Sequence, residues 1–186
     1  MEEEIIYVVN EKDQFVRKAT RQEVREKALL HRAARVIITN NEHKFLVQKR
    51  SASKDIHPSM WDIGIAETVK DGDSYESTAM RGLLEELGII GISNIQMMHS
   101  VLFKLKYFSL RHNILCKVYK LSYNGQIQLQ EEEIDEVKLL TKEEIINLIE
   151  KADFNPVGKV VFSKYLELKP NPSNKYPIIE VKETKK

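Results

Sequence analysis

Arg81, Glu85 and Glu86 have types and a spacing that suit chemistry, and they lie in one short stretch, RGLLEELG, at positions 81–88. Residues three and four positions apart share a face of a helix, so Arg81 is placed to pair with Glu85 and orient it. Carboxylates on such a face bind hard divalent cations through oxygen, above all Mg²⁺. A cation held in this way binds a diphosphate and positions an attacking water. The stretch therefore indicates metal-assisted chemistry on phosphates.

Gly82 is an unexpected residue in this helix, because glycine in a helix interior costs about 1 kcal/mol relative to alanine. The preceding loop adds the acids Glu67, Asp71 and Asp73, so a strand, an acidic loop and a helix follow one another over 66–89. On charge spacing alone, the simpler interpretation is a solvated amphipathic helix with ordinary surface ion pairs. A choice between the two interpretations needs a more specific pattern.

The segment 67–89 resembles the Nudix box of MutT-like hydrolases, G-x5-E-x7-R-E-U-x-E-E-x-G-U, in which U is a bulky aliphatic residue. The positions that match in order are Arg81, Leu83, Glu85, Glu86, Gly88 and Ile89. Asp73 replaces the first glutamate of the box conservatively. Glu67 stands where the family has glycine, and Gly82 stands where it has the glutamate after arginine. The pattern is specific despite these two departures.

The resemblance implies an α+β Nudix fold, which is an α/β/α sandwich with a mixed β-sheet and an N-terminal β-hairpin. It covers residues 3–167, so the expected organisation is a single Nudix hydrolase domain at 1–168 and a loose C-terminal tail at 169–186. The implied activity is hydrolysis of a nucleoside diphosphate linked to another moiety, with Mg²⁺ or Mn²⁺ as cofactor. The expected partner is a small-molecule diphosphate substrate, and a homodimer is left open.

The resemblance also implies roles for individual acids. Glu85 and Glu86 would hold the metal, with Arg81 orienting Glu85. A further carboxylate would complete the site, supplied by Glu67 or by the acidic run that contains Glu132. The alternative for that acidic run is a solvated entrance to a strand.

Glu67 and Gly82 motivate a hypothesis of compensation, in which the Glu67 carboxylate occupies the space left by the missing side chain at Gly82. The alternative is independent drift at a decaying site, which would leave a catalytically impaired Nudix-fold protein that binds a nucleotide or a partner. Arg50 and Lys54 are predicted to contact substrate phosphates.

Segments 30–33, 47–51 and 58–62 resemble one branch of the family. This branch includes isopentenyl-diphosphate isomerase and its hydrolase-type relatives. The isomerase needs a catalytic cysteine and a histidine-rich metal site. Ala66 occupies the position of that cysteine and Thr68 that of a metal-binding histidine, while His31 alone remains of the histidine set. The only cysteine, Cys116, lies in a later predicted strand. The residues therefore favour a hydrolase over an isomerase.

Periodicity and turn signals predict the elements that must position these residues. Strands are expected at 5–9, 14–19, 35–39, 44–49, 60–66, 95–108, 113–122 and 134–140, and helices at 20–30, 73–88, 141–151 and 155–168. Capping boxes are expected at Thr20 with Glu23 and at Asp73 with Glu76. Strands interrupted by a few helices are typical of an α+β fold on a mixed sheet.

The composition is that of an ordinary globular protein, with 186 residues and a net charge of +1. This small charge argues against nucleic-acid or membrane-surface partners. The single cysteine excludes an internal disulfide, and the acidic start MEEEIIYVV lacks the features of a signal peptide. No apolar run approaches the 18 or so residues of a membrane span. The expected location is cytoplasmic.

Overall fold

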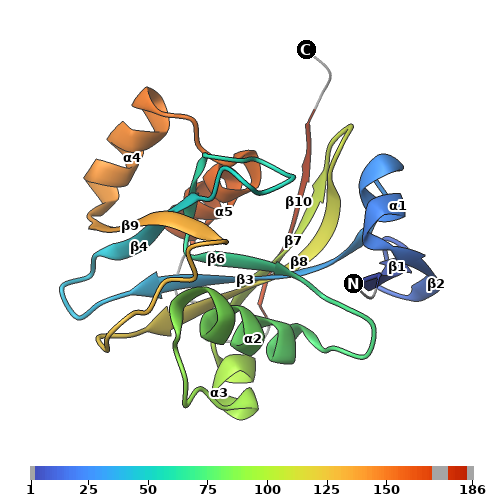
Figure 1. Cartoon of the computed structure of the whole chain (residues 1–186), viewed down its shortest axis with the longest axis horizontal. Coiled ribbons are helices and arrows are strands. Elements are labelled where there is room, and N and C mark those ends of the chain that lie inside the picture. The colour runs from blue at the N-terminus through green and yellow to red at the C-terminus, as the bar shows by residue number, and fades with distance from the viewer. Residues whose placement is uncertain (1–2, 169–175, 184–186) are drawn as a thin grey trace.

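The protein is built on a mixed β-sheet with helices on both faces, as Figure 1 shows for the computed structural model. The structure describes residues 3–168 and 176–183. Its strands are β1 (Ile5–Val9), β2 (Phe15–Thr20), β3 (His31–Thr39), β4 (Phe45–Arg50), β5 (Trp61–Ile63), β6 (Ile65–Thr68), β7 (Val101–Phe108), β8 (Asn113–Ser122), β9 (Ile134–Leu140) and β10 (Ile178–Lys182). Its helices are α1 (Arg21–Glu26), α2 (Tyr75–Leu87), α3 (Asn94–His99), α4 (Lys142–Lys151) and α5 (Pro156–Glu167).

Strand β3 is the centre of the sheet. It pairs in parallel with β8 and antiparallel with β6, within the strand order β10-β7-β8-β3-β1-β2. Strand β4 pairs with β5 and β9 beside this path. Alternate β3 residues face opposite sides, so Ala33 and Ile37 join one core whereas Ala34 and Val36 join the other. Burial on both faces explains the uninterrupted apolar run at 36–38 in the second half of this strand.

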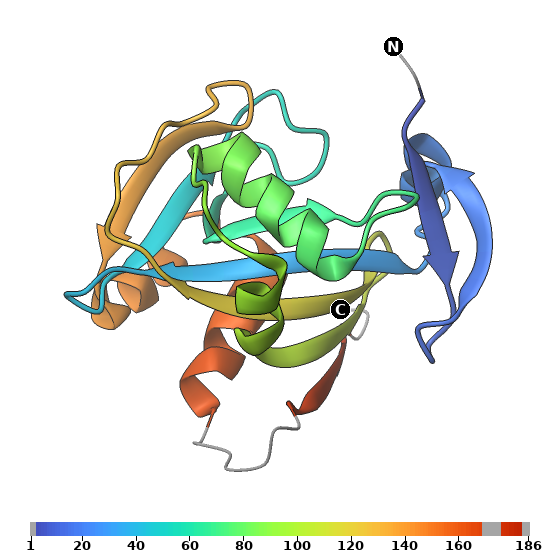
Figure 2. The same cartoon turned by 90° about the horizontal axis from the view of Figure 1, so that it is seen from below.

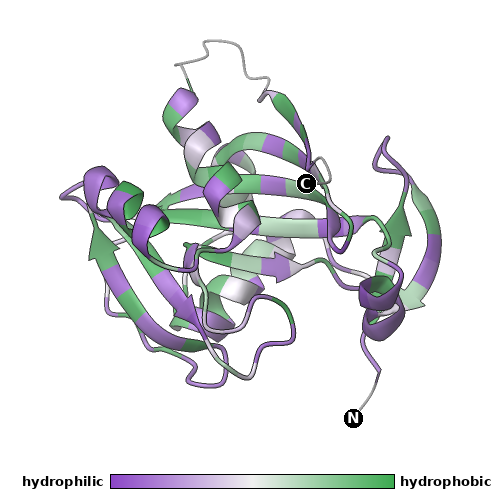
Figure 3. Cartoon of the chain, turned by 90° about the horizontal axis from the view of Figure 1, so that it is seen from above, coloured by the Kyte–Doolittle hydropathy of each residue, from purple (hydrophilic) through white to green (hydrophobic). Residues whose placement is uncertain are grey.

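The two cores correspond to the two helix layers. Val161 and Phe162 of α5 pack on one face of the sheet, and Leu83 and Leu87 of α2 pack on the other. Figure 2 shows α2 crossing the sheet, and Figure 3 shows hydrophobic residues concentrated along the strands. The expected α/β/α sandwich and mixed sheet are confirmed. Among the described residues, no helix is both long enough and apolar enough to span a membrane.

The N-terminal hairpin formed by β1 and β2 is confirmed, and it lies at one end of the sheet in Figure 2. Thr20 caps α1, because its side chain accepts a hydrogen bond from the Glu23 backbone N–H. The helix is shorter than the expected 20–30. It ends at Glu26. The helix cannot extend through Ala28, because Ala28 has a φ of +47°, which is incompatible with a right-handed helix.

Strand β3 begins four residues before the expected 35–39, and two further predicted strands are divided or replaced in part. The expected strand at 60–66 is divided at Gly64, whose φ of +60° and close approach to the Val36 carbonyl exclude a side chain. The expected strand at 95–108 is wrong in its first half, which forms α3. The Ser93 hydroxyl caps that helix by accepting from the Gln96 N–H.

The cap of α2 also differs from the expectation. Ser74 is the N-cap and forms a capping box with Ser77, in place of Asp73 with Glu76. Asp73 instead accepts a hydrogen bond from Arg81. The predicted end of the helix is confirmed, since Gly88 caps it with a left-handed φ of +64°.

The prediction of a loose tail at 169–186 is wrong for the part that the structure describes. Strand β10 adds to the sheet edge, parallel to β7, in a register that pairs Ile178 with Lys104. The Tyr107 hydroxyl donates to the Glu183 carboxylate at 2.5 Å. Backbone pairing at an open edge stabilises a segment whose composition alone suggests a coil. Positions 169–175 and 184–186 lie outside the described residues.

Candidate active site

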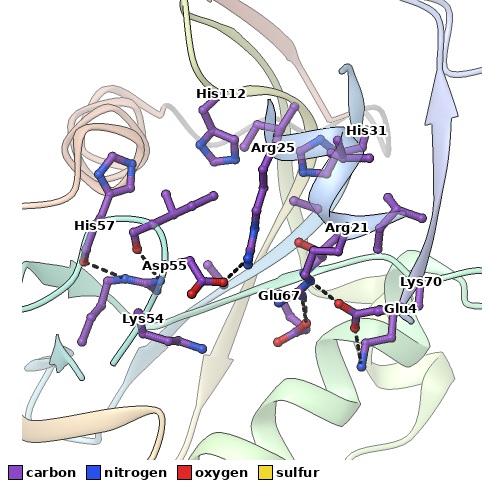
Figure 4. A pocket seen from close by; sticks show the side chains of 18 of the residues that line it. Glu4, Arg21, Arg25, His31, Lys54, Asp55, His57, Glu67, Lys70 and His112 are labelled. Carbon is purple, nitrogen blue, oxygen red and sulfur yellow. Dashed lines mark hydrogen bonds and ion pairs between the residues drawn. The ribbon is translucent and has the colours of Figure 1, made fainter. Parts of the chain in front are cut away.

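A cleft of about 480 Å³ opens between β3, β6 and α1, and the loops at 51–60 and 109–112 form its other walls. Charged and histidine side chains from all of these segments line it. Figure 4 shows three histidines along one side of the cleft, whereas Glu67 lies on another side with Arg21 and Glu4. The cleft therefore has an acidic end and a histidine end.

Arg81 organises the acidic end. Its Nη2 donates to Asp73 Oδ2 at 2.9 Å, and its Nη1 lies 3.5 Å from Glu67 Oε1 and 3.6 Å from Glu85 Oε2. The expected pairing of Arg81 with Glu85 is present, but the Arg81 guanidinium also contacts two other acids, Asp73 and Glu67. The side chain of Glu85 remains 51% exposed, so this pair alone contributes little to stability.

Glu86 is the buried acid of the box, with 6% of its surface exposed. Gln48 of β4 donates from Nε2 to Glu86 Oε2 at 3.2 Å. Among the described residues, no lysine, arginine or histidine forms an ion pair with this carboxylate. Burial, together with the negative charge of Glu67, raises the pKa of Glu86 to about 7. Glu86 is therefore a buried carboxylate without a cation.

Gly82 lies where strand β6 packs against α2. A β-carbon placed on it would lie 2.8 Å from Ile65 Cδ1, 3.4 Å from Glu67 Cβ and 3.7 Å from Glu86 Oε1. The Glu67 side chain is only 15% exposed and lies 3.7 Å from Arg21 as well as beside Arg81. The glycine thus leaves room for a glutamate from the neighbouring strand next to Glu86.

The donor set of the acidic end fits a divalent cation in its chemistry. Two acids, Glu67 and Glu86, lie next to Gly82, and repulsion between their charges contributes to the raised pKa of Glu86. A cation would relieve that repulsion, and oxygen ligands suit Mg²⁺ or Mn²⁺. Within residues 3–168 and 176–183, no group of three or more acids, histidines or cysteines is close enough to form a complete metal site. Substrate oxygens and water would have to supply the remaining ligands.

Glu132 lies at the rim of the cleft and is exposed. Its carboxylate accepts from Gln130 at 3.4 Å, and its backbone carbonyl accepts from Ser53. The neighbouring Glu133 forms an ion pair with Lys54. Of the acids predicted to complete the site, Glu67 is the one in contact with the box.

Arg50 and Lys54, predicted to contact substrate phosphates, both line the cleft. Arg50 donates from Nε to the His57 carbonyl at 3.1 Å and from Nη2 to the Ile56 carbonyl at 2.9 Å. Burial lowers the pKa of Arg50. Burial also lowers the pKa of Lys54, although Glu86 opposes the shift. Arg50 thus holds the loop at 51–60 and has no carboxylate partner among the described residues.

The positions expected for isomerase chemistry are not equipped for it. Ala66 and Thr68 line the cleft, but neither side chain can relay a proton as a thiol or imidazole can. Cys116 lies in the core with 2% exposure, and burial raises the pKa of its thiol to about 12. His31 donates from Nδ1 to the Leu29 carbonyl at 2.9 Å in the donor tautomer.

Several cleft residues carry no distinguishing signal in the sequence. Gln48 occupies an ordinary position in a strand, and Arg21 lies in a short surface helix. His57 and His112 lie in loops with no recognisable motif. Their contribution depends on contacts between segments far apart in the chain. Only the three-dimensional structure brings them to the cleft.

Comparisons with known proteins identify the family and the fold. A family model of the NUDIX domain matches residues 29–162. An uncharacterised Nudix hydrolase of Yersinia pestis is 34% identical over 146 residues, which cover 76% of this chain and 75% of that protein. The crystal structure of DR0079 from Deinococcus radiodurans has a TM-score of 0.71 at 22% identity, covering 87% of this chain and 99% of that one.

A further solved structure is the NUDIX domain of Shewanella oneidensis NrtR, which was crystallised with ADP ribose. It has a TM-score of 0.54 at 14% identity and covers 80% of this chain and 98% of that chain. At this identity the likeness concerns the fold.

Proposed function

This chain belongs to the Nudix hydrolase family, whose members act on phosphorus anhydride bonds, and from that premise we propose that it is a metal-dependent pyrophosphohydrolase. Its substrate would be a nucleoside diphosphate linked to another moiety. The observation that carries the proposal is the buried carboxylate of Glu86 next to Gly82, close to Glu67, which lines the open cleft together with Glu85. A buried carboxylate without a cation partner lowers the free energy of unfolding. Such a residue is a candidate for a functional role, and binding a metal ion is a role that would use its charge.

Glu86 and Glu67 would hold the metal, with Glu85 at the exposed side and Glu132 at the rim. When bound, Mg²⁺ or Mn²⁺ supplies charge neutralisation for the diphosphate and activation of water. This assignment uses Glu67 in place of the carboxylate that the helix lacks at Gly82. The compensation hypothesis is therefore part of the proposal.

The side chains of the acidic end keep these acids in position. Arg81 holds Glu67, Asp73 and Glu85 through one guanidinium, so that the loop, strand and helix keep a fixed arrangement. Gln48 fixes Glu86 Oε2 by a hydrogen bond. Burial and the charge of Glu67 raise the pKa of Glu86 to about 7 in the metal-free protein, and a bound cation would favour the ionised carboxylate.

The substrate class rests on the positive side chains of the cleft and on the neighbour crystallised with ADP ribose. Arg50 and Lys54 would contact the phosphates, Arg50 through the part of its guanidinium that does not hold the loop. A nucleoside diphosphate linked to a sugar is accordingly the first compound to test. The cytoplasmic location and a homodimer remain predictions.

A second candidate function is a catalytically impaired Nudix-fold protein that binds a nucleotide or a partner. Gly82 favours it, since a helix without its third carboxylate has fewer metal ligands. Isopentenyl-diphosphate isomerase activity has no support from Ala66, Thr68 or the buried Cys116.

The test is release of phosphate products from nucleoside diphosphates, triphosphates, nucleotide sugars and dinucleoside polyphosphates, with Mg²⁺ or Mn²⁺. The Glu86→Gln protein runs in parallel as a near-isosteric control. We expect metal-dependent turnover of at least one diphosphate-linked compound and its loss in the variant. Equal or absent turnover in both proteins would favour the binding protein.

A further inference from the structure

Three histidines from distant segments meet at the end of the cleft opposite the box. The His112 ring centroid lies 5.8 Å from that of His31 and 6.3 Å from that of His57. Figure 4 shows them together on one side of the cleft, and all three line it. His31 begins β3, whereas His57 and His112 lie in the loops at 51–60 and 109–112. None of them belongs to the acidic end.

Burial favours the uncharged form of the three imidazoles, and one of them, His112, has an unsatisfied ring nitrogen. Nδ1 of His112 is buried and has no hydrogen-bond partner among the described residues. Burial and the neighbouring histidines lower the pKa of His112 to about 3, and burial lowers the pKa of His31 and His57. Arg35 and Arg50 face His112, Arg21 and Arg25 face His31, and Glu183 and Asp62 are the acids that face His57. Buried polar atoms of this kind usually have a partner.

The cations of the cleft differ in whether they have an acid as a partner. Arg25 pairs with Asp55, Arg21 pairs with Glu4, and Lys54 pairs with Glu133. Among the described residues, Arg50 in contrast donates to backbone carbonyls and to no carboxylate.

Arg111 is exposed beside His112 and forms no ion pair within the described part of the chain. With Arg50, it gives the histidine end an excess of positive charge and unused hydrogen-bonding groups.

We propose that the histidine end binds a phosphate group of the substrate, separate from the phosphates held at the acidic end. Arg111 supplies the charged contact for it, the positive charge of the nearby Arg50 adds to the attraction, and the three imidazoles supply hydrogen bonds. The same arginines oppose a metal ion at the histidines, so an anion is the ligand that the charges favour. Resting on the proposed function, this assignment narrows the substrate to a diphosphate that carries an additional phosphate monoester.

The experiment follows the histidine side chains by NMR in metal-free protein during titration with inorganic phosphate. His43 and His99 do not line the cleft and serve as internal references. We expect the signals of His31, His57 and His112 to shift and those of the references to stay. Arg111→Ala should weaken binding at least about tenfold, as expected for loss of a charge-assisted contact. Arg17→Ala, which removes an exposed arginine outside the cleft, should leave binding unchanged.

The same titration with NADP⁺ and NAD⁺ distinguishes a substrate phosphate from a free phosphate ion, because the two compounds differ by one phosphate monoester. Tighter binding of NADP⁺ that depends on Arg111 supports the proposal. It is overturned if phosphate shifts no cleft histidine, if all five histidines respond alike, or if NADP⁺ and NAD⁺ bind equally. These readouts need neither metal nor turnover, so failure of the hydrolase proposal would appear separately, in the product assay.

Discussion

The acidic end and the histidine end of the cleft are shaped by one physical effect that acts in opposite directions. Burial disfavours charge, so it raises the pKa of the Glu86 carboxyl and lowers the pKa of the His112 imidazole. In the described part of the chain, Glu86 has no cation at ion-pair distance and Arg50 has no carboxylate. The two ends are therefore suited to ligands of opposite charge. Our proposals place a metal at the first end and a phosphate at the second.

The largest expected effect comes from Glu86→Gln, which keeps the shape of the side chain but removes its charge. We expect turnover to fall by at least about 10² and Mn²⁺ binding to weaken in parallel. Arg111→Ala should instead raise KM with little change in kcat, because the substrate phosphate binds far from the reacting bond. Kinetics on one substrate and Mn²⁺ binding followed by electron paramagnetic resonance measure both. Equal losses of kcat in Glu86→Gln and Arg111→Ala would contradict the assignment of different roles to the two ends.

The exchange of Glu67 and Gly82 tests how the acidic end is assembled. Glu67→Gly should reduce turnover by about 10- to 100-fold, through loss of one metal carboxylate. Gly82→Glu alone should also impair the protein, because its β-carbon would lie 3.4 Å from Glu67 Cβ and its carboxylate would be crowded against Glu67 and Glu86. The double variant restores the usual box and should regain activity and Mn²⁺ affinity.

Thermal unfolding of the three exchange variants separates catalysis from folding, since Gly82→Glu is the one expected to lower Tm. Non-additive recovery in the double variant is the signature of compensation. If the activity of the double variant equals the product of the two single effects, the two departures from the box are independent. That result would favour the interpretation of a decaying site.

The sequence predicted the acidic end of the cleft better than the histidine end. The box helix was predictable, because Arg81 and Glu85 have helical spacing and Gly88 supplies a left-handed cap. The acids of the helix were predictable for the same local reason. Local signals also located β8 at 113–122 with its observed boundaries.

What the sequence could not predict is non-local. The contact of Glu67 with Gly82 depends on how β6 crosses α2, and the meeting of His31, His57 and His112 depends on three loops and strand ends. Strand β10 was missed because its stabilisation comes from pairing with β7. The histidine end therefore went unnoticed while the acidic end was found.

The dependence of stability on pH should differ in sign between the two ends. Glu86 has a pKa of about 7 in the folded state and 4.5 as its ordinary value, so the folded state binds more protons between these limits. Its contribution therefore lowers the free energy of unfolding as pH rises from 4.5 to 7. His112 has a pKa of about 3 against an ordinary 6.5, so its contribution raises the free energy of unfolding from pH 3 to 6.5.

Chemical denaturation of metal-free protein between pH 4.5 and 6.5 measures these slopes. Glu86→Gln should make the free energy of unfolding rise more steeply with pH, and His112→Asn should make it rise less steeply. Each change is at most about 1.4 kcal/mol per pH unit for one titrating group. His43→Asn removes an exposed imidazole and is the matched control. Slopes that move in the same direction in both variants would contradict the opposed pKa shifts.

The smallest expected effect comes from Lys54, which faces the acidic end. Its positive charge lowers the pKa of Glu86, whereas Arg50 acts on Glu86 and also on His57 and His112. Lys54→Met should therefore raise the pKa of Glu86 by a few tenths of a unit to about one unit and leave the histidines unaffected. Arg50→Met should raise the pKa of Glu86 and of both histidines. Carboxyl and imidazole NMR titrations in metal-free protein measure the pKa of each group in one sample. A change in the pKa of His112 in Lys54→Met would mean that the two ends are electrostatically a single site.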